Sequence, residues 1–247
     1  MPFTIDPNLY NQIGLDSGSL TMLGSIVHSL GAPGQYRVAL HRGETVEGVC
    51  FITADNDSPA AQVTVDLASS ATPAAGPGAS PAGGAGCGCG GQGGPAGKHL
   101  TVNPKGYVLF RVSGGSGGYY VHVRRIDADQ SDKGYDSRVL GEGDLFTAIL
   151  LRPGTYSISN TLTKATGQIV VPYPKIGTKP YVPPPPARVS CGAKSLEPAR
   201  VEAQPGQAVI FEAKAASRIV VKLEKADDGP GGAGRSSRPG LRRIALK

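Results

Sequence analysis

The chain has 247 residues, a formal net charge of +6 and 39% hydrophobic residues, with no tryptophan. Its 36 glycines and 21 prolines argue against one large core and favour small modules joined by turns and linkers. The positive charge gathers in a basic tail, residues 229–247, which contains no acidic residue. We therefore expect nucleic acid or another anionic surface to bind only there, through Arg235, Arg238, Arg242 and Arg243.

The N-terminal segment, residues 1–35, is predicted to contain one short helix. Apolar residues recur at helical spacing from Leu20 to Leu30, and Gly31 with Pro33 would end the helix. The segment lacks the basic start and apolar stretch of a signal peptide, and no run is long enough to span a bilayer. We expect a cytoplasmic protein, or one that is particle-associated or exported by another route.

Residues 36–68 alternate apolar and polar side chains, which predicts a β-hairpin or partial sheet. So few strands cannot bury a core alone. Residues 69–98 follow as a Gly/Pro-rich low-complexity tract, which we expect to be a linker. This tract holds Cys87 and Cys89, for which three interpretations stay open: a copper or zinc site, an intermolecular crosslink, or no specific role. A metal would need further ligands, and His99 is a candidate; no other cofactor is expected.

Residues 99–175 are predicted to form a central β-sandwich, because short strands alternate with glycine and proline turns. Period-two alternation places Tyr120, His122 and Arg124 together on the solvent face, where they suit ligand binding. The same alternation gives three sets of inward residues: Val108, Phe110 and Val112; Tyr119, Val121 and Val123; and Tyr156 and Ile158 opposite Ile169 and Val171.

Residues 176–188 read as a polyproline linker with four consecutive prolines, Pro183, Pro184, Pro185 and Pro186. We expect the stretch 176–190 to run extended along a neighbouring subunit. Residues 189–228 predict a C-terminal β module that is half a sandwich. Because a bare sheet exposes an apolar face and an open edge, this module is expected to pair with residues 36–68 or with another chain.

A family resemblance rests on turn residues and strand rhythm. The stretch "LLRPGTYSISNTLTKATGQIVV" resembles the closing hairpin of a cupredoxin, and "SLEPARVEAQPGQAVIF" resembles its opening. The resemblance covers residues 99–172 and, more faintly, 189–225. The resemblance implies antiparallel Greek-key β-sandwich modules, either cupredoxin-like or immunoglobulin-like. The family's copper-ligating cysteine would fall near Asn160, and the loop after it has no histidine or methionine, so no type-1 copper site is expected. A weak internal echo links "LTVNPKGYVLFRV" to "ARVEAQPGQAVIFEA".

Catalytic motifs are missing: no G-x-S-x-G elbow follows a strand, no P-loop is present, and four histidines lie in four separate segments. We therefore expect a non-enzymatic structural or accessory subunit that acts through protein–protein contacts in a larger homo-oligomeric assembly. The alternative is a metal-handling or electron-transfer accessory protein that uses Cys87 and Cys89. A weaker alternative is a binder of anionic surfaces or nucleic acid through the basic tail.

Overall fold

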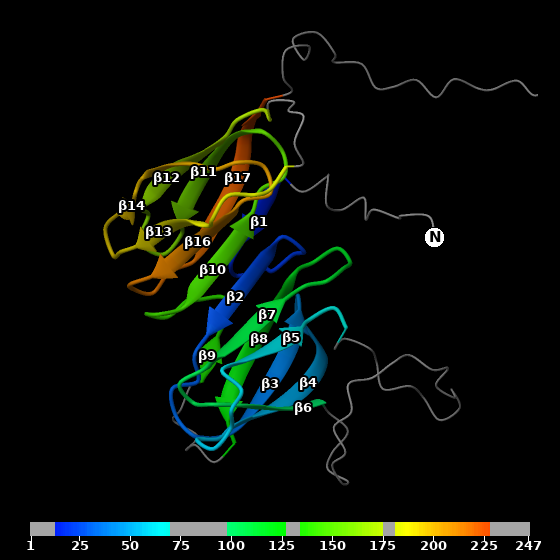
Figure 1. Ribbon diagram of the computed structural model, residues 1–247. Coiled ribbons are helices and arrows are strands. Elements are labelled where there is room, and N and C mark those ends of the chain that lie inside the picture. The colour runs from blue at the N-terminus through cyan, green and yellow to red at the C-terminus, as the bar shows by residue number, and fades with distance from the viewer. Residues whose placement is uncertain (1–12, 70–97, 127–133, 175–180, 228–247) are drawn as a thin grey trace, which may run out of the picture.

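The computed structural model describes residues 13–69, 98–126, 134–174 and 181–227, which form 17 β-strands in three sheets (Figure 1). Those residues contain no helix, so the mainly-β, sandwich-like architecture is confirmed. The strands are β1 (Gly14–Asp16), β2 (Gly24–His28), β3 (Gly34–Arg42), β4 (Thr45–Ala54), β5 (Gln62–Asp66), β6 (Lys98–Val102), β7 (Tyr107–Arg111), β8 (Tyr119–Arg125), β9 (Tyr135–Asp136), β10 (Leu145–Ile149), β11 (Gly154–Asn160), β12 (Thr166–Val171), β13 (Ala187–Cys191), β14 (Leu196–Glu197), β15 (Arg200–Glu202), β16 (Ala208–Ala213) and β17 (Ile219–Ala226).

The strands build two lobes that share one sheet (Figure 1). In lobe one the five-stranded sheet β6-β4-β3-β8-β9 lies over strands β2, β7 and β5. In lobe two the sheet β1-β17-β11-β12-β15 lies over β14, β13, β16 and β10. Strands β2 and β10 pair antiparallel, with Ile26 opposite Phe146, and so join the two half-sheets into one of seven strands. The buried apolar side chains of both lobes form one continuous cluster.

The two lobes repeat one strand pattern, carried by residues 14–126 (repeat one) and 134–227 (repeat two). Strands β2 to β5 correspond to β10 to β13, and strands β6, β7 and β8 to β15, β16 and β17. The pairings agree: β4–β6 and β12–β15 are parallel, as are β5–β7 and β13–β16. The following residues recur in matching order: Gly14 and Gly134, Asp16 and Asp136, Ser17 and Ser137, Leu20 and Leu140, Pro33 and Pro153, Gly34 and Gly154, Tyr36 and Tyr156. The weak sequence echo is thus part of a duplication of the whole unit.

Each repeat places its first strand in the other lobe. Strand β1 pairs with β17 of repeat two, and β9 pairs with β8 of repeat one. Equivalent serines fix both exchanges. The Ser17 N–H donates to the Ile219 carbonyl at 2.9 Å, and the Ser17 hydroxyl accepts from the Ile219 N–H at 3.0 Å. Ser137 makes the matching pair of hydrogen bonds to Val121, at 3.0 and 2.9 Å.

The Pro-Gly-x-Tyr sequence starts the third strand of each repeat in the same way. Gly34 and Gly154 have φ angles of 145° and 151°, which residues with a Cβ rarely adopt. The tyrosine two residues later fixes the turn that leads into the strand, because its hydroxyl binds a backbone carbonyl of that turn. The Tyr36 hydroxyl donates to the Ala32 carbonyl at 2.8 Å, and the Tyr156 hydroxyl donates to the Arg152 carbonyl at 2.7 Å.

The helix expected within residues 17–30 is wrong. Residues Gly24–His28 form β2, in which Gly24 and Ile26 are buried and Ser25 and Val27 are half-buried. Strand β2 lies between β7 and β10, so neighbours satisfy its backbone on both edges. Gly18 and Gly24 also disfavour a helix. The hydrogen bonds to β7 and β10 therefore decide the conformation of this segment, although its apolar residues fit helical spacing.

One further expectation needs correction. The sheets are mixed rather than purely antiparallel, because a strand of the opposite layer intervenes between each pair of parallel neighbours. The strands of residues 99–175 pair with several parts of the chain. Residues 98–125 pair with strands of 24–66 and with β9, and residues 145–171 pair with strands of 187–226 and with β2. The expected inward residues are confirmed: Val108, Phe110, Val112, Tyr119, Val121, Val123, Tyr156, Ile158, Ile169 and Val171 are all buried.

Candidate functional site

Several residues singled out in the sequence lie outside the described part of the chain: Cys87, Cys89, Arg235, Arg238, Arg242 and Arg243. The described end of the proline segment lies against its own chain. There the Tyr181 hydroxyl donates to the Pro205 carbonyl at 2.6 Å, and the Gln207 amide donates to the Pro185 carbonyl at 2.6 Å. His99 belongs to β6, and its ring stacks on Phe51 with centroids 5.0 Å apart.

The described residues offer no metal centre, because none of their His, Cys, Asp and Glu side chains gather in a group of three or more that could hold an ion. Cys50 and Cys191 are free, and burial raises the pKa of their thiols to about 11 and about 12. Asn160, at the position of the missing copper ligand, is a buried structural residue. Its amide donates to the Ser217 hydroxyl at 3.0 Å and accepts from the Arg218 N–H at 3.2 Å.

The most distinctive surface is the solvent side of the sheet β6-β4-β3-β8-β9, which we call the outer face of lobe one. Strand β8 alternates as expected: Tyr119, Val121 and Val123 are buried, whereas Tyr120, His122 and Arg124 point outward. The register places His41 opposite Tyr120 and Ala39 opposite His122. The outer face carries His99, Val46, Val49, Phe51, Arg37, Ala39, His41, Tyr120, His122, Arg124 and Asp136.

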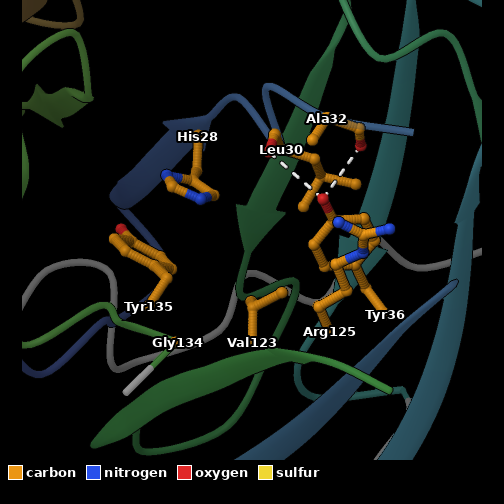
Figure 2. Close-up of a pocket in the computed structure, with 8 residues that line it drawn as sticks. All are labelled: His28, Leu30, Ala32, Tyr36, Val123, Arg125, Gly134 and Tyr135. Carbon is orange, nitrogen blue, oxygen red and sulfur yellow. Dashed lines mark hydrogen bonds between the residues drawn. The ribbon is translucent and has the colours of Figure 1, made fainter. Parts of the chain in front are cut away.

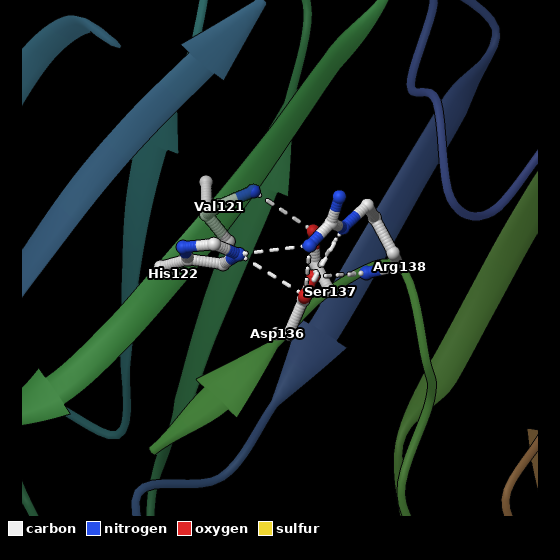
Figure 3. Close-up of polar contacts among 5 residues, drawn as sticks. All are labelled: Val121, His122, Asp136, Ser137 and Arg138. Atoms are coloured by element: carbon white, nitrogen blue, oxygen red, sulfur yellow. Dashed lines mark hydrogen bonds and ion pairs between the residues drawn. The ribbon is translucent and has the colours of Figure 1, made fainter. Parts of the chain in front are cut away.

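An ion-pair network occupies one edge of this face (Figure 3). The Asp136 carboxylate accepts from the Arg138 guanidinium at 2.7 and 3.1 Å and lies 3.0 Å from His122 Nε2. Partial burial would raise the pKa of Asp136, but the hydrogen bonds from Arg138 and the charge of His122 prevail and lower it. The carboxylate is therefore held in its charged form, and it fixes both neighbouring side chains.

Aromatic rings continue the network across β3 and β8. The His41 ring stacks on Tyr120 with centroids 4.8 Å apart and lies 4.6 Å from the ring of His122. The Arg138 guanidinium lies over Tyr120, 4.5 Å from its ring centroid. Burial, with the positive charges of His122 and Arg138, lowers the pKa of His41. Its imidazole is therefore neutral at pH 7 and presents a flat, polarisable surface.

A groove of about 400 Å³ runs beside these rings. It is lined by Arg37, Ala39, His41, Val46, His122, Val123, Arg124 and Asp136. Its lining therefore combines guanidinium and imidazole groups with small apolar side chains.

A second hollow, of about 300 Å³, lies where repeat two meets lobe one (Figure 2). His28 Nδ1 lies 2.7 Å from the Asp144 carboxylate, and the His28 ring stacks on Tyr135 at 3.7 Å. Burial, with the charge of Asp144, raises the pKa of Tyr135 well above its usual range. The Tyr36 hydroxyl that reaches this hollow is bound to backbone carbonyls. His28 and Tyr36 thus have hydrogen-bond partners, whereas the buried Tyr135 hydroxyl has none among the described residues.

Repeat two provides an internal comparison for the outer face. Tyr36 lies opposite Arg125 and Tyr156 opposite Leu223, which fixes the equivalent positions along the sheets. Only the aspartate is shared: Asp16 binds the Arg218 guanidinium at 2.8 Å, as Asp136 binds Arg138. The remaining positions differ, with Thr161 for His41, Arg218 for Tyr120, Val220 for His122, Ser157 for Arg37, Ser159 for Ala39, Lys222 for Arg124 and Gly18 for Arg138. The ring cluster and groove are thus particular to lobe one.

Comparison with known proteins adds no family: no family model matches the chain, and neither a curated protein nor a solved structure matches it. The resemblance to cupredoxins therefore has support only at the level of a mainly-β, sandwich-like architecture. The described residues include no helix long and apolar enough to cross a membrane.

Proposed function

We propose that the chain is a non-enzymatic structural or accessory subunit that acts through protein–protein contacts in an assembly of its own copies. The outer face of lobe one is the contact surface in this proposal. One observation carries it: the rings of His41, Tyr120 and His122 and the Arg138 guanidinium contact one another on this face, which also carries the stacked pair Phe51–His99, and the equivalent face of lobe two lacks the cluster. Aromatic residues and arginine are the side chains that protein interfaces favour over the rest of the surface.

The contacts around Asp136 support a preorganised contact surface. The Arg138 guanidinium binds the Asp136 carboxylate at 2.7 Å, and the carboxylate lies 3.0 Å from His122 Nε2. These contacts fix the neighbouring rings in place, which lowers the entropy lost when a partner binds.

The scaffold also suits a contact surface. Strand β9 of repeat two extends the sheet of lobe one, and β1 of repeat one extends the sheet of lobe two. Asp136 and Arg138 therefore reach the face from the opposite repeat. A partner that binds this face contacts a surface that both repeats build, so binding favours the closed arrangement of the two lobes.

The test is the solution mass of the full-length chain by light scattering, with and without reductant. We expect a defined mass that is a multiple of 25.3 kDa and that the reductant leaves unchanged. The triple variant Phe51→Ala, His41→Ala, Tyr120→Ala should give the monomer mass while keeping the thermal midpoint of a folded protein. A wild-type monomer at all concentrations would contradict the proposal. A mass that falls to that of the monomer when reductant is added would instead show that cysteine crosslinks hold the assembly together.

A further inference from the structure

We propose that the groove on the outer face of lobe one binds a phosphate group between Arg37 and Arg124. The two arginines lie directly opposite each other on β3 and β8. Like charges at directly opposite positions of an antiparallel pair destabilise the sheet. An anion between the two guanidiniums would remove that repulsion and turn it into attraction. The groove lies on the outer face of lobe one, which is also the proposed contact surface, so a bound phosphate would lie within that contact in the assembly.

Both guanidiniums are available for a ligand. Within the described residues, neither Arg37 nor Arg124 has an ion pair or a side-chain hydrogen bond, and both are exposed. Three other arginines do have a carboxylate partner: Arg138 binds Asp136, Arg218 binds Asp16 and Arg111 binds Asp66. What distinguishes Arg37 and Arg124 is that they lie opposite each other beside a groove.

The surroundings favour an anion of this size. The groove of about 400 Å³ has room for a phosphate group and for part of the molecule that carries it. His41 and His122 line it and present imidazole nitrogens along its wall. The only carboxylate in the lining is that of Asp136, which Arg138 already binds at 2.7 Å. The two arginines therefore make the field inside the groove positive.

A phosphate suits two guanidiniums better than a carboxylate does. Each guanidinium presents a planar fork of N–H donors. A phosphate group offers three acceptor oxygens and a charge of about −1.5 to −2 at pH 7, whereas a carboxylate offers two oxygens and a single charge, so the phosphate attracts both guanidiniums more strongly. The equivalent pair in lobe two is Ser157 opposite Lys222, with a single cation, and it should not hold a phosphate in this way.

The test is a titration of the full-length chain with inorganic phosphate at constant ionic strength, followed by amide chemical shifts. We expect saturable shifts at Arg37, His41, His122 and Arg124, and binding of acetate at least tenfold weaker. The variant Arg37→Glu should abolish the shifts and keep or raise the thermal midpoint, because the new carboxylate would lie opposite Arg124 as an attractive pair. The matched variant Lys222→Glu should bind phosphate as the wild type does.

The proposal would be overturned by shifts that grow linearly without saturation, by phosphate binding that survives Arg37→Glu, or by equal loss in Lys222→Glu. A second arm uses O-phosphoserine in place of inorganic phosphate. Equal affinity means that the free anion is recognised, and tighter binding assigns the phosphate to a phosphorylated side chain. Acetate that binds as well as phosphate would contradict the arrangement with two guanidiniums.

Discussion

Asp16 and Asp136 stand at equivalent places in the two repeats, yet the arginines that bind them stand at different places. Asp16 pairs with Arg218, which precedes β17, across the sheet, and Asp136 pairs with Arg138, two residues along its own chain. A side chain at Gly18, the equivalent of Arg138, would meet the Arg218 guanidinium at 2.6 Å. Asp136 takes its arginine from position 138 instead. The lobe-one position equivalent to Arg218 is therefore free for Tyr120, whose ring lies under the Arg138 guanidinium.

The difference separates residues that build the fold from residues that are free to bind. What both repeats keep has a structural role: the serines that fix the exchanged strands, the tyrosines that fix the turns, and the aspartates that hold an arginine. What only repeat one carries, the rings of His41, Tyr120 and His122 and the opposed arginines, lies on the solvent side of the sheet. The predictions below test this separation.

The largest effect is expected in the shared core. Phe110 and Phe211 are fully buried at equivalent positions, so Phe110→Ala and Phe211→Ala should each lower the free energy of unfolding by about 3–5 kcal/mol. Because one apolar cluster spans both lobes, each variant should still unfold in a single transition. Denaturant melts followed by circular dichroism measure this. Two separated transitions would show that the lobes are independent.

The shared tyrosines should give smaller and matching effects. Tyr36→Phe and Tyr156→Phe each remove one hydroxyl that donates to a turn carbonyl, at 2.8 and 2.7 Å. Each should lower the free energy of unfolding by about 1 kcal/mol. Thermal melts of the two variants under one set of conditions measure the difference. A loss confined to one repeat would mean that the turn has a structural role in only one lobe.

The pH dependence of stability should single out Asp136. Its pKa is lowered in the folded chain from the ordinary value of 3.8, so its charged form stabilises the fold above pH 3.8. That contribution is lost as the pH falls through the lower, folded-state pKa. The variant Asp136→Asn should therefore be less stable than the wild type at neutral pH, and the gap should close in acid. A gap that stays constant down to about pH 2 would contradict the lowered pKa.

The smallest effect concerns the buried thiols. Burial raises the pKa of Cys50 to about 11 and of Cys191 to about 12, so neither is a thiolate at neutral pH. Both should resist alkylation in the native chain and react after unfolding, as peptide mass spectrometry can show. Rapid native modification of either residue would mean that its lobe opens locally.

The strands of this chain could be predicted from sequence because period-two alternation is local. Val108, Phe110 and Tyr156 were placed inward correctly, and Tyr120, His122 and Arg124 outward. The pairing of β2 could not be predicted, because its partners β7 and β10 lie far along the chain. The apolar residues of β2 and its flanks also fit helical spacing, so the local pattern favoured a helix.

Only part of the candidate site could be predicted from sequence, because the rest depends on long-range strand pairing. His122 and Asp136 meet because β9 pairs with β8, and Arg138 then reaches the ring of Tyr120. One signal was available: Gly-x-Asp-Ser occurs at 14–17 and again at 134–137, and Pro-Gly-x-Tyr occurs at 33–36 and again at 153–156. Aligning these motifs reveals the duplication and marks Asp136 as part of the shared scaffold.

The most direct test compares matched variants of the two outer faces by light scattering. The face variant carries Phe51→Ala, His41→Ala and Tyr120→Ala in lobe one, and the control carries Ser157→Ala, Ser159→Ala and Thr161→Ala in lobe two. We predict that the control keeps the wild-type mass, whereas the face variant falls to 25.3 kDa and remains folded. Equal masses for the two variants would contradict the claim that lobe one alone carries the contact surface.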